Sequence, residues 1–133
     1  MKKTAILFLM LFLAVTVADA STWVVKDAKI EFNDCPNRLT VVRYGLNYIT
    51  SGNHRGDACV YVTVRTKGPV TRGCVYFKVL SKDGDVIFTE KKRISLLSGR
   101  EHNYFSYISR TRIGGRDIKA QIGVACNCTR AGY

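Results

Sequence analysis

Residues 73–90 read GCVYFKVLSKDGDVIFTE, two apolar, β-rich runs on either side of Asp83-Gly84. An Asp-Gly pair between two such runs is a strong sequence signal for a β-hairpin with a two-residue turn. That turn predicts a register in which Val79 lies opposite Phe88. The same register places five apolar residues on one face, which we expect to be buried: Val75, Phe77, Val79, Val86 and Phe88.

The rest of the chain repeats this pattern of short β-rich segments separated by turn residues. We expect strands over residues 23–32, 38–49 (with a bulge at Gly45) and 59–65, and an open loop over residues 50–57. The strand at 59–65 alternates, so its three inward residues are predicted to be buried: Val60, Val62 and Val64.

A second hairpin is expected over residues 101–128, with its turn at Gly114-Gly115 and Phe105 opposite Val124. No long segment shows the 3.6-residue apolar period of a helix. The chain is therefore predicted to be all-β, an immunoglobulin-like antiparallel β-sandwich stabilised by disulfides.

The first 20 residues have the composition of an export signal. They combine a positively charged start (MKK), an apolar run over residues 5–17 and a small-residue ADA motif at 18–20. The apolar run is shorter than the roughly 20 residues that cross a bilayer. We predict a signal peptide over residues 1–20 and one domain over residues 21–133, secreted or, in a bacterium, periplasmic.

Without the leader the chain carries 19 Lys and Arg (21 minus 2) against 9 Asp and Glu (10 minus 1), a net charge of +10. Such a charge favours anionic partners. The second hairpin would set Arg110 opposite Lys119, a like-charge pair that costs stability unless an anion is bound. Charge that protects an edge strand against aggregation is the alternative interpretation. The candidate ligand-binding surface comprises seven residues: Lys91, Lys92, Arg93, Arg110, Arg112, Arg116 and Lys119. Three tyrosines expected at the surface could add stacking: Tyr61, Tyr76 and Tyr104.

All five cysteines lie after the leader, which favours two disulfides and one free thiol. Cys59 and Cys74 each begin a strand, so they are expected at opposite ends of the sandwich, beyond the about 7 Å that a disulfide allows between Cα atoms. If successive strands run up and down the sandwich, four cysteines are expected at one end and Cys74 at the other. The four are Cys35, Cys59, Cys126 and Cys128. We predict that the first two bond to the last two, in an order left open, and that Cys74 is a free thiol or links two copies as a homodimer.

The residue pattern argues against enzymatic, metal and cofactor chemistry. Neither His54 nor His102 is accompanied by a nucleophile and an orienting carboxylate. The carboxylates lie mostly in turns, no glycine-rich segment opens a helix, and no C-x-x-C pair marks a zinc site. Residues 127–129 (Asn-Cys-Thr) form an N-glycosylation sequon, although a bonded Cys128 would make Asn127 a poor acceptor.

The order of several motifs resembles the secreted ML lipid-recognition family. The shared features are Asp34-Cys35 followed by Asn37, an Asp-Gly strand pair over residues 75–88, Leu97-Ser98-Gly99 before the aromatic strand 104–108, and Cys126 at the end of the last strand. The resemblance implies an immunoglobulin-like sandwich that binds a lipid between its sheets, and a disulfide between Cys35 and Cys126. The family's Cys-Pro-Leu motif and its early, closely spaced cysteine pair are absent. A secreted immunoglobulin-like domain of no assigned family stays open.

These observations lead to one main functional expectation. The chain is predicted to be a secreted, non-enzymatic protein that binds an anionic or amphipathic extracellular ligand, such as a glycan, a lipid, a membrane surface or a cell-surface polymer, and not nucleic acid. The alternative is an extracellular structural or partner-binding domain, linked as a dimer through Cys74. A small hydrolase or ribonuclease is the remaining enzymatic alternative.

Overall fold

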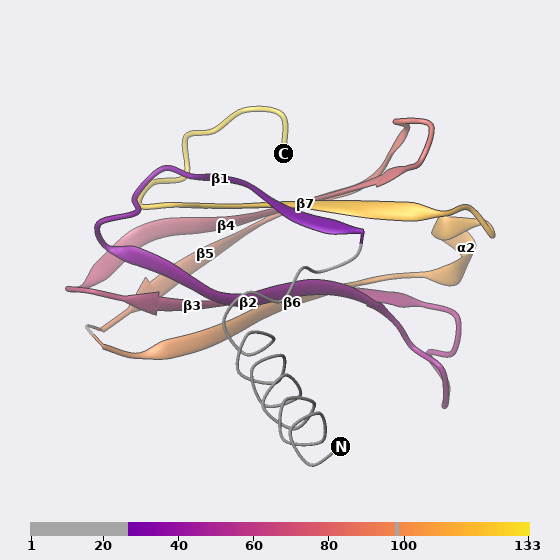
Figure 1. Cartoon of the computed structure of the whole chain (residues 1–133), viewed down its shortest axis with the longest axis horizontal. Coiled ribbons are helices and arrows are strands. Elements are labelled where there is room, and N and C mark those ends of the chain that lie inside the picture. Colours follow the sequence, from indigo (N-terminus) through magenta and orange to yellow (C-terminus); the bar gives the residue numbers. More distant parts are fainter. Residues whose placement is uncertain (1–26, 98) are drawn as a thin grey trace, which may run out of the picture.

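The structure, a computed structural model, describes residues 27–97 and 99–133 and consists of two β-sheets packed face to face (Figure 1). The predicted signal peptide and residues 23–26 of the predicted first strand lie outside the described residues. The all-β prediction is confirmed. The elements are β1 (Ala28–Asn33), β2 (Leu39–Tyr48), β3 (Ala58–Thr66), β4 (Val70–Ser81), β5 (Val86–Leu96), β6 (Glu101–Ile108), α2 (Arg110–Ile113) and β7 (Ile118–Ala125).

One sheet has four strands in the order β1-β7-β4-β5, and the other has three in the order β2-β3-β6. β1 and β7 run parallel, and the other pairs are antiparallel. The β-sandwich is therefore as predicted, but the immunoglobulin-like topology is not confirmed. In the immunoglobulin fold the second and fifth strands share a sheet, whereas β2 and β5 belong to different sheets here.

The hairpin of β4 and β5 forms in the predicted register, with Val79 opposite Phe88. The prediction of a two-residue turn was wrong, because the Ser81 N–H donates to the Asp85 carbonyl at 2.8 Å around a loop over residues 82–84. A register shift beside this loop sets Leu80 opposite Val86. The shift turns Val86 outward, where it is 57% exposed, so the prediction that it is buried was wrong. β5 continues to Leu96, so the basic residues at 91–93 lie within this strand.

Two smaller expectations can be compared with the backbone. The loop at 50–57 lies between β2 and β3, as predicted. The irregularity in β2 lies between Val41 and Arg43, however, and not at Gly45. Gly45 instead stays paired with Tyr61 in a regular part of the ladder.

The second predicted hairpin is wrong. β6 pairs with β3, so Phe105 lies opposite Tyr61, while β7 pairs with β4, so Val124 lies opposite Val75. Between them the one-turn helix α2 carries the chain from one sheet to the other. The Ser109 side chain accepts from the α2 backbone at its start, and a left-handed glycine ends the turn. The sequence therefore holds helix-capping residues where we expected a hairpin turn. No helix among the described residues is long and apolar enough to cross a membrane.

The core lies between the sheets and is built from the central strands. Val60, Val62 and Val64 of β3 are fully buried, as their alternation predicted. They face the other sheet, where the β4 and β7 side chains of the same core cluster are also fully buried: Val75, Phe77, Val79, Ile122 and Val124. Full burial of a Val or Phe side chain contributes about 1.5–3 kcal/mol, so these strands hold the two sheets together.

Two disulfides join strand ends at one end of the sandwich: Cys35–Cys126, with a Cα separation of 5.7 Å, and Cys74–Cys128, with a separation of 5.2 Å. The unpaired cysteine is Cys59, so the prediction of a free Cys74, and of a dimer through it, was wrong. Cys59 and Cys74 do lie apart, as expected. Cys35 does lie with Cys126, as expected, because β1 and β7 run parallel. The expected directions of β3 and β4 were wrong: β4 begins where β7 ends, and β3 begins at the other end, so Cys74 and Cys59 exchange places.

Candidate functional site

The outer face of the four-stranded sheet carries a line of cations that strand pairing brings together. Lys29 of β1 and Lys78 of β4 flank the same residue of β7, Gln121, from opposite sides. Lys119 is two residues away along β7, so it lies diagonally beside both. On the neighbouring strand β5, Lys91 lies opposite Tyr76 and Arg93 opposite Cys74, so both face the same side. We call these five cations the lysine band: Lys29, Lys119, Lys78, Lys91 and Arg93.

Few acids neutralise the lysine band. Lys29 Nζ lies 3.0 Å from a Glu31 carboxylate oxygen, and the other four cations form no ion pair within the described residues. Lys78 Nζ lies 4.3 Å from the centre of the Tyr133 ring, a cation–π contact that leaves the charge uncompensated. Diagonal neighbours on a sheet are about 7–8 Å apart, so these cations repel one another. An anion lying over the band would relieve that repulsion.

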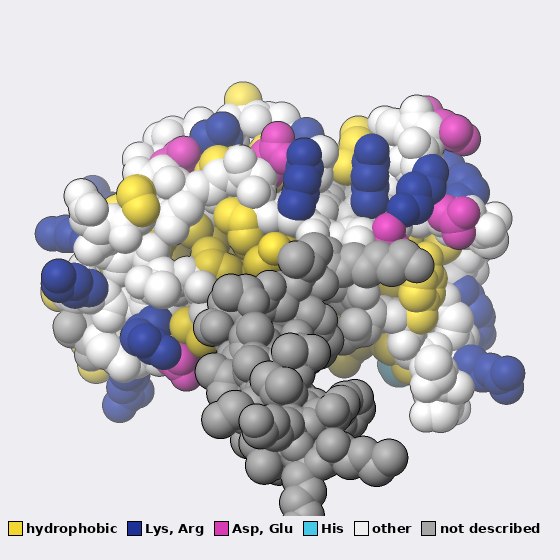
Figure 2. All heavy atoms as spheres, in the orientation of Figure 1, with side chains coloured by type: hydrophobic (Ala, Val, Ile, Leu, Met, Phe, Trp, Pro, Cys, Tyr) yellow, Lys and Arg dark blue, Asp and Glu magenta, His cyan; other side chains and the backbone are white. Residues whose placement is uncertain are grey.

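A shallow hollow of about 280 Å³ lies at one end of the lysine band, lined by Lys29, Lys119 and Lys82. Lys82 Nζ donates to an Asp27 carboxylate oxygen at 2.5 Å, and this hydrogen bond raises the pKa of Lys82. The hollow thus combines three lysines with one aspartate. Figure 2 shows dark-blue Lys and Arg side chains along the side of the molecule that carries β1 and β7, with magenta acids beside some of them.

The C-terminal tail covers the other end of this face, where it loops over β1 and β7 (Figure 1). Tyr76 was expected at the surface, but it is fully buried, with its ring centre 5.4 Å from that of Phe32 and 5.3 Å from that of Tyr133. Arg130 stacks on Phe32 at 3.6 Å and pairs with Asp34 at 2.9 Å. These contacts hold the tail on the sheet against the band, where Tyr133 contacts Lys78 and the Cys128 carbonyl accepts from Lys91 Nζ at 3.4 Å.

Strand pairing divides the predicted basic surface into two groups. The expected pairing of Arg110 with Lys119 does not exist, because α2 and β7 do not form a hairpin. Lys29 and Lys78 were missed, since only the pairing of β7 with β1 and β4 shows that they lie beside Lys119. Three of the predicted residues join the lysine band: Lys91, Arg93 and Lys119. The other four do not: Lys92, Arg110, Arg112 and Arg116.

The four residues outside the band have other contacts. Lys92 faces the opposite side of β5 and pairs with Glu90 at 3.2 Å. Arg110 donates to two carbonyl oxygens of the loop between β2 and β3, at 2.7 and 3.4 Å. Arg116 donates to two carbonyl oxygens of α2, at 3.0 and 2.9 Å. Arg112 is exposed, 5.9 Å from the Phe88 ring centre. Two of these three guanidinium groups, those of Arg110 and Arg116, thus stabilise local backbone.

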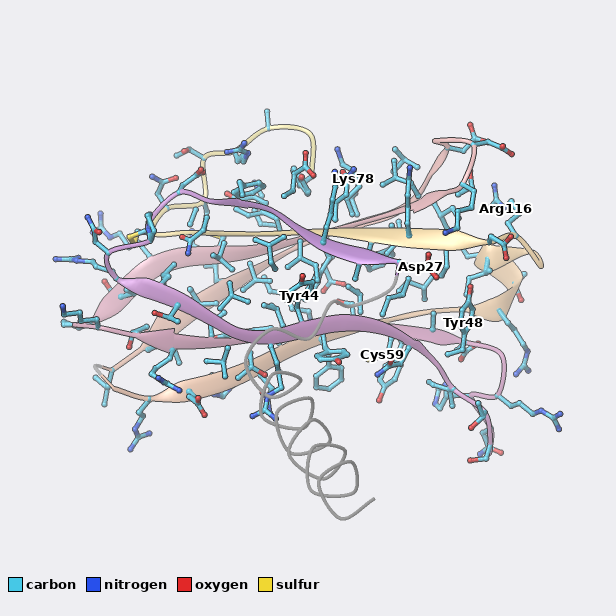
Figure 3. The ribbon with its side chains drawn as sticks, in the orientation of Figure 1. Asp27, Tyr44, Tyr48, Cys59, Lys78 and Arg116 are labelled. Atoms are coloured by element: carbon cyan, nitrogen blue, oxygen red, sulfur yellow. A yellow bond between two sulfur atoms is a disulfide. The ribbon has the colours of Figure 1, made fainter. Side chains whose placement is uncertain are left out.

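The outer face of the three-stranded sheet has a different character. A groove of about 390 Å³ crosses it, lined by aromatic and polar side chains and by Cys59. Burial raises the pKa of the Cys59 thiol, so the group is protonated near neutral pH. Figure 3 shows Lys78 and Cys59 on opposite outer sides of the molecule, with Tyr44 between the sheets.

The predicted glycosylation sequon lies in the tail. Asn127 is exposed, and its Oδ1 accepts from the Thr129 hydroxyl at 2.7 Å. The residue between them, Cys128, is held in its disulfide. Cys128 is thus bonded, the condition under which we expect Asn127 to be a poor acceptor of a glycan.

Comparisons with known proteins assign no family. No family model matches the chain, and no curated protein matches it. One similar solved structure is Campylobacter jejuni cj0090, with 22% sequence identity over 62% of this chain and 83% of that chain, and a TM-score of 0.40. Another is the variable domain of the Streptococcus agalactiae AgI/II polypeptide BspA, with 16% identity over 71% of this chain and 69% of that chain, and a TM-score of 0.22.

Proposed function

We propose that this protein is exported and is a non-enzymatic binding protein that attaches to an anionic polysaccharide through the lysine band. The single observation that supports this most is the row of five cations across four strands, of which only Lys29 has an ion-pair partner in the described residues. A line of charges suits a linear polymer that presents repeated carboxylates or sulfates, because each unit of the polymer can approach one cation.

The test compares two variants with the same change in charge. Lys78→Glu with Lys119→Glu reverses the centre of the lysine band, while Arg38→Glu with Lys67→Glu reverses two exposed cations outside it. At about 1 kcal/mol per cation near an anionic surface, loss of the two lysines alone costs about 2 kcal/mol, or roughly 30-fold in Kd, and the two added carboxylates weaken binding further. We expect it to elute from heparin–agarose at much lower salt than the wild type, and the control to elute close to the wild type.

Equal losses in the two variants would show that net charge alone sets retention, which contradicts a site at the band. Retention of the wild type that does not weaken with salt would also contradict it, because exposed charges are screened over about 10 Å at 0.1 M salt. Phosphatidylserine vesicles provide the comparison with a membrane. Stronger binding to the vesicles than to heparin would replace the polysaccharide with a lipid surface as the ligand.

A further inference from the structure

The groove on the outer face of the three-stranded sheet has a floor of aromatic side chains. Tyr61 of β3 lies flat across β2, because Gly45 opposite it has no side chain: a Cβ there would lie 2.6 Å from Tyr61 Oη. Phe105 and Tyr107 of β6 line the same groove. Their two rings pack edge to face against each other, with ring centres 5.5 Å apart. They are 46% and 54% exposed. Large apolar surfaces left in solvent together commonly mark a binding site.

A loop residue supports this floor from the side. The His54 ring stacks on Tyr107 at 5.6 Å with an interplanar angle of 14°. His54 Nδ1 is in turn 2.9 Å from a carboxylate oxygen of Asp57, whose other oxygen accepts from the backbone N–H of Arg110 at 2.8 Å. Tyr107, which packs against Phe105, is therefore held in place before any ligand arrives, which lowers the entropic cost of binding.

The polar wall of the groove offers hydrogen-bond donors. The Thr63 hydroxyl donates to Asn103 Oδ1, so the amide nitrogen of Asn103 remains as a donor. Arg43, the cation of the groove, has no ion-pair partner among the described residues. A ligand that fits this wall must supply acceptors, and a negative charge for Arg43.

The geometry points to a second binding site here, for an acidic saccharide. The C–H face of a pyranose ring would stack on Phe105 and Tyr61, since the face of an aromatic ring is electronegative. Its carboxylate would pair with Arg43, and a hydroxyl would accept from Asn103. The groove volume is at the small end of the roughly 300–1,000 Å³ of small-ligand sites. The lysine band lies on the opposite outer face, so the two sites can be occupied independently.

A peptide strand fits this groove less well than a sugar. The groove lies over β3, whose backbone pairs with β2 on one side and β6 on the other. Its N–H and C=O groups are thus used within the sheet, and a peptide strand cannot add to it there. Recognition must come from side chains, and the side chains present are rings, an amide and a guanidinium.

The experiment measures binding of three acidic oligosaccharides, from hyaluronan, polygalacturonate and polysialic acid, with neutral chitotetraose as the matched control. At least one acidic probe should bind more tightly than chitotetraose. Arg43→Gln should weaken that binding by about tenfold or more, and Phe105→Ala by about 3–10-fold. The Lys78→Glu, Lys119→Glu variant should keep the affinity of the groove within about twofold while it loses heparin retention. This pair of outcomes separates the groove from the proposed function of the band.

Cys59 supplies a second measurement that needs no variant, because the thiol lines the groove and the other four cysteines are bonded. A bound acidic saccharide should slow alkylation of Cys59 by N-ethylmaleimide in the native protein, and chitotetraose should not. Failure of all three acidic probes to bind or to protect Cys59 would overturn the inference. Equal binding of chitotetraose, or binding unchanged in Arg43→Gln, would overturn recognition of the acid. Displacement by an acidic peptide at lower concentration would assign the groove to a peptide.

Discussion

Removal of the Cys74–Cys128 disulfide is the most direct test of how this sandwich is closed. The bond closes a loop of 54 residues. In the chain-entropy description, a loop of that length contributes about 4 kcal/mol at 25 °C by restricting the unfolded chain. Folded domains of this size are stable by about 5–15 kcal/mol. A Cys74→Ala, Cys128→Ala variant should therefore remain folded and be about 4 kcal/mol less stable than the wild type.

Two matched variants make the test specific. Cys59→Ala removes the unpaired thiol and should change stability by less than about 1 kcal/mol, because the side chain is partly exposed and crosslinks nothing. Cys35→Ala with Cys126→Ala opens a loop of 91 residues. Loop length alone makes that loss about 0.5 kcal/mol larger than the loss for 54 residues.

Urea unfolding followed by circular dichroism gives the three free energies, and alkylation before reduction identifies the free cysteine by mass. We expect N-ethylmaleimide on Cys59 alone. Alkylation of Cys74 in the native oxidised protein would refute the disulfide pattern. A loss of about 4 kcal/mol in Cys59→Ala, with none in Cys74→Ala, would show that the directions of β3 and β4 are wrong.

Three further substitutions test the packing and the loop. Gly123→Ala should cost about 1–3 kcal/mol in urea unfolding, because the Phe32 ring occupies the space of an added Cβ; an unchanged free energy would contradict that contact. Phe77→Ala should cost about 3–5 kcal/mol as a fully buried core residue, and a cost below 1 kcal/mol would contradict its central position. The hydrogen bond from the Arg110 backbone lowers the pKa of Asp57, so its stabilisation is complete above the unfolded pKa of about 3.9 and is lost as pH falls toward the lower folded value. Asp57→Asn should thus be less stable than wild type at pH 7, with a difference that shrinks below pH 4; a difference independent of pH would contradict this role.

Much of the local structure could be predicted because it depends on neighbouring residues. The Asp-Gly pair predicted where the β4–β5 hairpin turns, and Val79 lies opposite Phe88 as expected. Alternation identified the buried valines of β3. The same reasoning was wrong at Val86, since a register shift of one residue beside the turn reverses which face a side chain takes.

The candidate sites could be predicted only in part, because each combines strands that are distant in the sequence. Lys29, Lys78 and Lys119 become neighbours through β7, and nothing local indicates that pairing. Phe105 and Tyr61 meet in the groove because β6 pairs with β3 and not with β7. An alternating strand such as β6 can bury its apolar face beside either β3 or β7, so alternation alone could not predict which of the two it pairs with.

The amino-acid sequence by itself determined that this chain is a β-protein with a net positive charge, where most of its strands and turns lie, and that it has one cysteine more than two disulfides need. These properties follow from period-2 alternation, turn chemistry and composition, which act over a few residues. Only the tertiary structure decided which cysteine is free, which lysines form a band and which aromatic rings share a groove. Those depend on strand direction and on the crossing from one sheet to the other at α2, which are set by how the whole core packs.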